Sequence, residues 1–102
     1  INFLVFKSAN CTDKFIKIED HALVDVHGAP LASGIVDSFA RITPSVCQHV
    51  CISLPEMNCN AFMYSYQERV CNITKLNTDA IHTRLMPKPG MDYYHRERCE
   101  GV

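Results

Sequence analysis

The residues with the clearest potential for chemistry in this chain of 102 residues are its six cysteines. An even number of cysteines, spread from one end of a short chain to the other, is typical of a disulfide framework formed in an oxidising compartment. Many pairings are possible, so the count alone selects none of them. The cysteines are Cys11, Cys47, Cys51, Cys59, Cys71 and Cys99.

Zinc binding is the alternative chemistry for these cysteines. Structural zinc sites usually combine two closely spaced ligands with a second close pair. Cys47 and Cys51 are close in the sequence, with His49 between them, but the other cysteines stand singly and no histidine lies at a ligand-like offset from them. We therefore expect disulfides, no metal site and no cofactor.

Catalysis would need a nucleophile or an acid and base pair held in a pocket. If every cysteine is bridged, no thiolate is available as a nucleophile. The histidines fall in different expected elements, and no spacing joins them to one another or to a carboxylate. We therefore expect no catalytic residues and no enzymatic activity. The histidines are His21, His27, His49, His82 and His95.

Basic residues in the C-terminal third could bind a polyanion such as a glycosaminoglycan. Acidic residues are interleaved with them, and a solvated surface of mixed charge is the competing interpretation. Over the whole chain, 10 Lys and Arg residues stand against 11 Asp and Glu residues, which disfavours a nucleic acid partner. The candidate polyanion-binding residues are Lys75, Arg84, Lys88, Arg96 and Arg98.

Two sequons predict glycosylation at Asn10 and Asn72. They read Asn10-Cys11-Thr12 and Asn72-Ile73-Thr74, and each could carry a glycan if the chain enters the secretory pathway. Disulfide formation at Cys11 could compete with modification of Asn10. Together with the cysteine count, the sequons predict an extracellular location, either secreted, in a matrix or in the ectodomain of a surface protein.

A short helix is the clearest element expected to position these cysteines. Thr43 is a suitable N-cap and Pro44 a suitable first helical residue, and apolar residues then recur at helical spacing until Pro55. Cys47 and Cys51 lie four positions apart, so their side chains should leave the same face of this helix.

Strands are expected on both sides of the helix. The aromatic run 59–66 and the alternating run 70–74 predict a hairpin with a turn at 67–69. Further strands are expected at 15–19, 22–26 and 91–96, a turn or loop at 28–34, and a long surface connection at 78–90. This order predicts an α+β domain, in which one helix packs on an antiparallel sheet.

Composition limits the chain to a small globular domain. Hydrophobic residues make up 47% and charged residues 21% of it, and its length fits a single domain over residues 1–102. No apolar run approaches the roughly 20 residues that span a bilayer, so we expect no membrane insertion. The opening residues do not read as an intact signal peptide. We therefore expect a mature chain or a module excised from a larger extracellular protein.

The cysteine spacing resembles that of the PAN/apple domain family. The specific part is the run Cys47-x3-Cys51-x7-Cys59-Asn60-Ala61-Phe62-Met63-Tyr64, followed by Cys71, and Cys11 and Cys99 match the six-cysteine, apple-type variant. The resemblance covers about residues 11–99. It implies nested disulfides that join Cys11 to Cys99, Cys47 to Cys71, and Cys51 to Cys59, and the expected helix and hairpin agree with the two inner pairs.

The resemblance also implies a function. Modules of this family serve as non-catalytic binding units within larger chains, and they contact extracellular proteins or carbohydrates. Two alternatives stay open at this point, a structural element of an extracellular matrix that associates with itself, and a module that binds glycosaminoglycan or another carbohydrate. The oligomeric state and the identity of the ligand are not predicted.

Overall fold

A computed structural model of the chain describes residues 14–31, 34–53, 58–76 and 82–96. The described elements are seven strands and one helix. They are β1 (Phe15–Ile18), β2 (His21–Asp25), β3 (Ile35–Ala40), α2 (Pro44–Ser53), β4 (Ala61–Ser65), β5 (Val70–Thr74), β6 (Thr83–Pro87) and β7 (Met91–Arg96).

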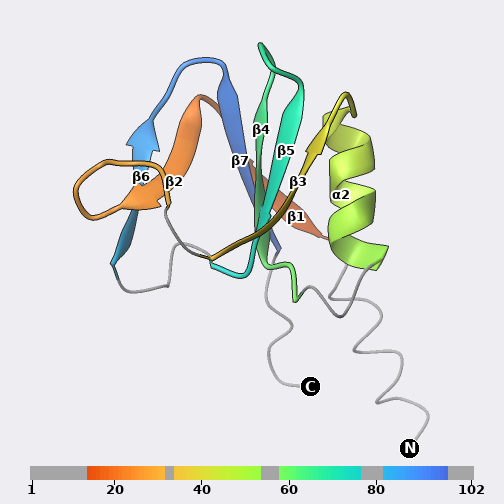
Figure 1. The fold of residues 1–102 in the computed structure, drawn as a ribbon, viewed down its shortest axis with the longest axis horizontal. Helices are drawn as coiled ribbons and strands as arrows, with labels where there is room; N and C mark the ends of the chain where they lie inside the picture. The colour runs from red at the N-terminus through yellow and green to blue at the C-terminus, as the bar shows by residue number, and fades with distance from the viewer. Residues whose placement is uncertain (1–13, 32–33, 54–57, 77–81, 97–102) are drawn as a thin grey trace, which may run out of the picture.

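The strands form two antiparallel sheets. The larger sheet has five strands in the order β1-β7-β4-β5-β3, and the smaller one consists of β2 and β6. In Figure 1 the helix α2 lies on one side of the larger sheet and the smaller sheet lies on the other. The expected α+β class, with one helix packed on antiparallel sheet, is therefore confirmed.

Strand β4 is buried along its whole length because both faces of the larger sheet are covered. Successive side chains of a strand point to opposite faces. Phe62 and Tyr64 accordingly belong to the core beneath α2, whereas Ala61 and Met63 belong to a second core beneath β2 and β6. The domain thus has a separate apolar cluster on each side of one sheet.

Helix α2 begins and faces the sheet as expected. The Thr43 hydroxyl accepts a hydrogen bond of 3.2 Å from the Val46 amide, which is the arrangement of a helix N-cap. Cys47 and Cys51 are the buried residues of the helix. Both therefore face the strands beneath it.

Two disulfides fasten α2 to the hairpin that follows it. One joins Cys47 to Cys71 on β5, with 6.0 Å between the Cα atoms, and the other joins Cys51 to Cys59, with 5.3 Å. These are the two inner pairs of the nested framework that the family resemblance implies. The outer pair, Cys11 with Cys99, lies outside the described residues.

Two strands were not expected from the sequence. Strand β6 lies inside the segment 78–90, for which the sequence predicts a surface connection, because Thr83–Pro87 shows little alternation and ends in proline. Its antiparallel pairing with β2 makes it a strand. Strand β3 is an edge strand whose register shifts between Ile35 and Asp37, and this irregularity interrupts the alternating pattern. Tyr66 lies in the turn after β4 instead of on the strand.

Candidate functional site

The structure places four of the five predicted basic residues in two separate groups, and Arg98 lies outside the described residues. Arg84 lies on β6 and Lys88 directly follows it. Lys75 follows β5 and Arg96 ends β7, and Asn60 links their backbones by donating to the Lys75 carbonyl at 2.6 Å and accepting from the Arg96 amide at 2.9 Å. The two groups belong to different sheets.

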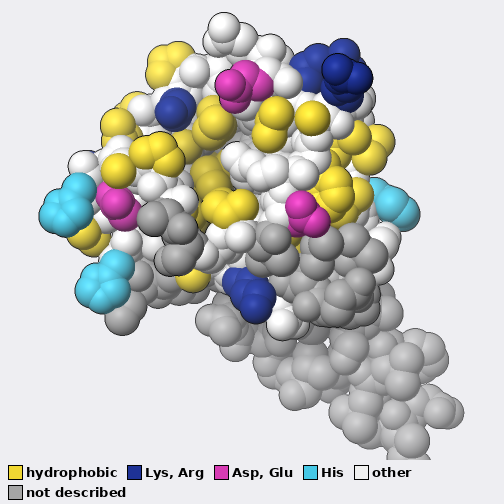
Figure 2. All heavy atoms as spheres, in the orientation of Figure 1, with side chains coloured by type: hydrophobic (Ala, Val, Ile, Leu, Met, Phe, Trp, Pro, Cys, Tyr) yellow, Lys and Arg dark blue, Asp and Glu magenta, His cyan; other side chains and the backbone are white. Residues whose placement is uncertain are grey.

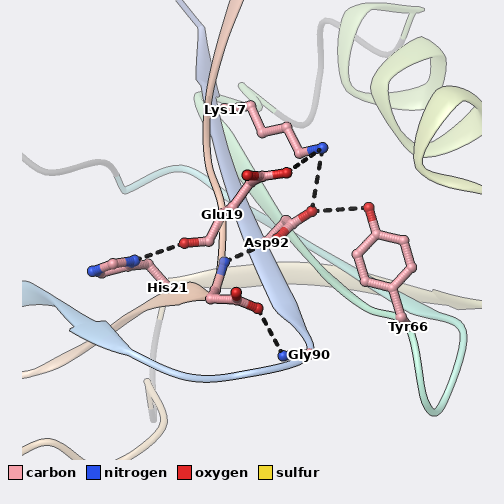
Figure 3. A network of polar contacts seen from close by, with 7 residues as sticks. Lys17, Glu19, His21, Tyr66, Gly90 and Asp92 are labelled. Atoms are coloured by element: carbon pink, nitrogen blue, oxygen red, sulfur yellow. Dashed lines mark hydrogen bonds and ion pairs between the residues drawn. The ribbon is translucent and has the colours of Figure 1, made fainter.

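A polar network at the opposite end of β7 from Arg96 ties several turns together (Figure 3). Its centre is Asp92 on β7, which is only 5% exposed. One carboxylate oxygen accepts a 3.0 Å hydrogen bond from the Asp20 amide. The other accepts a 2.9 Å hydrogen bond from the Tyr66 hydroxyl and lies 3.5 Å from Lys17 Nζ. These hydrogen bonds and the ion pair compensate the negative charge of the buried Asp92 carboxylate.

Two groups around Asp92 have raised pKa values. Desolvation of the hydroxyl, followed by its hydrogen bond to Asp92, raises the pKa of Tyr66 well above the usual 10.0, although the residue as a whole is 46% exposed. The pKa of Lys17 is raised chiefly by the interaction with Tyr94, with Asp92 and Glu19 adding to it. Tyr66 therefore stays a hydrogen-bond donor and Lys17 stays charged at neutral pH.

The same network holds the backbone around Lys88 in place. The Lys88 amide donates to the Asp20 carbonyl at 2.7 Å, and its own carbonyl accepts from the Met91 amide at 3.2 Å. The Gly90 amide donates to the Asp20 carboxylate at 3.0 Å. Lys88 therefore lies in a turn whose backbone is fixed by hydrogen bonds.

A cavity of about 130 Å³ lies between the two sheets, beside Lys88. Figure 2 shows hydrophobic side chains around a hollow on this face, between the two sheets of Figure 1. Most of the lining is apolar and comes from both sheets, and Lys88 is its only charged member among the described residues. The lining includes Leu31, Ile35, Met63, Met86, Met91 and Lys88.

A second hollow lies between the turn after β4 and the turn before β7. Its volume is about 270 Å³. Its lining is mainly polar and includes Gln67 and Glu68, and it shares Lys88 and Met91 with the first cavity. Lys88 therefore stands between an apolar cavity and a polar one.

Arg41 and Arg69 form a basic pair that the sequence does not indicate. The Arg41 amide donates to the Arg69 carbonyl at 2.8 Å, so the two residues lie side by side. Both are exposed and make no ion pair with any described carboxylate. Figure 2 shows Lys and Arg side chains gathered at one upper corner, where Figure 1 shows β3 leading into α2.

The backbone at both arginines is left-handed, with φ values of 64° for Arg41 and 56° for Arg69. This conformation costs an ordinary residue about 1–2 kcal/mol, and glycine or asparagine usually occupies it. Because neither residue is of a type that marks such a position, nothing in the sequence could have shown that the two arginines meet. The first turn of α2, which begins three residues after Arg41, contains no acidic residue, so no carboxylate of that turn offsets the positive end of the helix dipole.

The sequon at Asn72 lies on β5, and Asn10 lies outside the described residues. The Asn72 side chain is partly buried, lines the cavity between the sheets, and accepts a hydrogen bond from the Ser38 hydroxyl. Thr74, the hydroxyl residue of the sequon, is fully buried and donates to the Gly34 carbonyl at 2.7 Å. Attachment of a glycan would therefore have to precede formation of the sheet.

The described histidines and carboxylates are scattered. Within residues 14–31, 34–53, 58–76 and 82–96, no three His, Cys, Asp or Glu side chains lie close enough together to hold a metal ion. No cysteine in these segments is free. The helix found in them is too short to cross a membrane.

Comparison with known proteins places this geometry in a wider context. A model of the PAN domain family matches residues 11–99, which is most of the chain. No curated protein matches the sequence significantly.

Proposed function

The chain belongs to the PAN domain family, and from this membership we propose that it is a non-catalytic recognition module of a larger extracellular protein. PAN domains generally act as interaction modules that bind proteins or carbohydrates. Disulfides of the kind that fasten α2 are typical of extracellular proteins. The sequons at Asn10 and Asn72 are consistent with the same location.

The observation that carries the proposal is the pair Arg41 and Arg69. The two arginines are exposed, their backbones are joined by a hydrogen bond, and neither makes an ion pair with a described carboxylate. Their left-handed backbones are strained, and local strain of this kind often accompanies function. Guanidinium groups bind carboxylates and sulfates in a planar, two-pronged manner. This end of the domain therefore suits an anionic surface of a partner.

A glycosaminoglycan is the specific carbohydrate candidate. It would use the basic pair Arg41 and Arg69, with or without the predicted residues Lys75, Arg84, Lys88, Arg96 and Arg98. The separation of the predicted residues into two groups favours the basic pair as the primary contact, because a polyanion gains most from charges that lie close together.

A binding screen tests the recognition role. The wild-type chain and Arg41→Gln/Arg69→Gln should be applied to arrays of glycans and of secreted proteins and ectodomains. We expect at least one partner that the double variant binds about tenfold more weakly. An equal signal from both proteins on every partner, or no partner at all, would contradict the assignment.

Immobilised heparin tests the glycosaminoglycan candidate. We expect the wild-type chain to elute above about 0.15 M salt, and Arg41→Gln/Arg69→Gln to elute earlier. The matched control Arg84→Gln/Lys88→Gln removes the same charge from the other sheet and should elute near the wild type. Passage of the wild type in the flow-through would end this candidate.

Sedimentation over a concentration series separates recognition of another molecule from self-association. A monomer at all concentrations supports a distinct partner. Persistent association of the wild type would instead support the alternative role as a structural matrix element.

A further inference from the structure

The cavity between the two sheets combines an apolar interior with sulfur-containing walls. Met63 lies on β4, Met86 on β6 and Met91 at the start of β7, and all of them line it. Thioether side chains are flexible and polarisable, so they adapt to ligands of different shape. The volume of about 130 Å³ is close to the roughly 150 Å³ of an apolar cavity that binds benzene. The interior can therefore hold an apolar group of similar size.

Positive charge lies at one rim of this cavity. Lys88 is part of the lining, and Arg84 belongs to the same side of β6 as Met86, because side chains two apart share a face. The Arg84 guanidinium lies over Gly28, another lining residue: a Cβ at that position would be 3.1 Å from Arg84 Nη2 and 3.4 Å from Met86 Sδ. Arg84 and Lys88 thus place two positive charges along this rim, one on each side of Met86.

No described carboxylate lies within ion-pair distance of Arg84 or Lys88, and the described acidic lining residue, Glu68, belongs to the polar hollow that Lys88 also lines. Asp25 is close in the β2–β6 sheet, since the neighbouring Val24 pairs with Arg84. Its carboxylate, however, accepts hydrogen bonds from the amides of His27 at 2.8 Å and Ala29 at 2.9 Å. Asp25 Oδ1 is therefore occupied within its own turn, and Asp25 makes no ion pair with Arg84.

We propose that this cavity binds a small amphipathic anion, with an apolar group of about six carbons between the sheets and a carboxylate beside Lys88 and Arg84. The charge complementarity selects an anion, and the apolar lining selects a hydrocarbon or aromatic tail. The carboxylate would lie on the β6 side, because Glu68 lines the neighbouring polar hollow. The site is separate from the basic pair of Arg41 and Arg69 and does not depend on the proposed recognition role.

Hexanoate is the probe for this site, applied to the full 102-residue chain with its disulfides formed and without glycans. Methionine labelled with ¹³C at its methyl group reports directly on the lining residues Met63, Met86 and Met91. We expect saturable shifts of these signals, with a dissociation constant of about 1 mM. Hexan-1-ol, which has the same tail and no charge, should bind about fivefold more weakly. Acetate, which lacks the tail, should cause no saturable shift.

Substitution of Lys88 tests the charged rim. In Lys88→Gln, hexanoate should bind more weakly than in the wild type, with Arg84 retaining part of the preference for the anion, while the affinity for hexan-1-ol stays unchanged. The matched control Lys75→Gln removes an exposed lysine that does not line the cavity, and it should bind both probes as the wild type does. Arg41→Gln/Arg69→Gln should also leave hexanoate binding unchanged, which separates this site from the recognition surface.

Three results would overturn the proposal. The first is the absence of saturable shifts at Met63, Met86 and Met91 in the wild type. The second is equal affinity of the wild type for hexanoate and hexan-1-ol. The third is a Lys88→Gln variant that loses affinity for both probes equally, since that pattern indicates a distorted cavity and not a lost charge.

Discussion

The Tyr66 hydroxyl donates a 2.9 Å hydrogen bond to Asp92 Oδ2 across 26 positions of sequence. This contact joins the turn after β4 to the start of β7, and a backbone hydrogen bond of 3.1 Å from the Tyr66 amide to the Gly90 carbonyl reinforces it. Asp92 also accepts a hydrogen bond from the Asp20 amide and forms an ion pair with Lys17 (Figure 3). One buried carboxylate therefore fixes the turns that present Lys88 beside the cavity.

Removal of this hydroxyl should destabilise the domain modestly at neutral pH. We expect Tyr66→Phe to lower the free energy of unfolding by about 1 kcal/mol, because a hydrogen bond to a charged group is lost at a partly exposed site. Asp92 keeps its contacts with Asp20 and Lys17, so its carboxylate is not left unpartnered. Urea unfolding followed by circular dichroism at pH 7 measures the difference. A variant as stable as the wild type would show that the hydrogen bond contributes nothing.

The same substitution should change the dependence of stability on alkaline pH. The folded state raises the pKa of Tyr66 above its usual 10.0, so the folded protein holds the phenol proton where the unfolded chain releases it. This stabilisation is fully present below pH 10 and is lost as the pH rises further. We expect a shallower loss of stability above pH 10 in Tyr66→Phe. Lys17, whose pKa is also raised, affects the pH dependence of stability in both the wild type and the variant. Identical slopes of stability against pH in the two proteins would refute the role of Tyr66.

Gly34 is a position where any side chain should be costly. Its φ is +89°, and a Cβ there would lie 2.5 Å from Leu76 Cδ1 and 2.8 Å from Leu76 Cγ. We expect Gly34→Ala to lower the free energy of unfolding by about 2–4 kcal/mol, through the strained backbone and displacement of Leu76. Gly90 is a matched control, with φ of +84° and no atom within 4 Å of its added Cβ. Gly90→Ala should cost only about 1–2 kcal/mol, and equal losses in thermal or urea unfolding would contradict the steric role of Leu76.

The two described disulfides should differ in the stability that they provide. Cys47 and Cys71 are 24 positions apart, whereas Cys51 and Cys59 are 8 apart. In the chain-entropy account, loops of these lengths correspond to about 3.5 and about 2.6 kcal/mol. We therefore expect Cys47→Ala/Cys71→Ala to be less stable than Cys51→Ala/Cys59→Ala by about 1 kcal/mol. All four cysteines are buried, so the packing losses are similar, and the reverse order in urea unfolding would contradict this ranking.

Local sequence signals were sufficient for most of the fold. The N-cap at Thr43 and the regular spacing of Cys47 and Cys51 depend only on neighbouring residues, and so does the aromatic run that becomes β4. Strands β3 and β6 could not be predicted in this way. Residues 83–87 are extended because they form backbone hydrogen bonds with β2. This pairing with a distant segment produces no strand pattern in the local sequence, which ends in proline.

The sequence by itself determined the scaffold, because the cysteine spacing and the helix and hairpin signals are properties of short stretches of chain. Tertiary structure alone decided which charges meet. Arg41 and Arg69 become neighbours through a backbone hydrogen bond between separate strands and turns, and Lys88 reaches an apolar cavity because the sheet of β2 and β6 packs on the larger sheet. Backbone pairing and burial between residues far apart in the chain have no local periodicity, so candidate binding surfaces built by them emerge only when the sheets are packed.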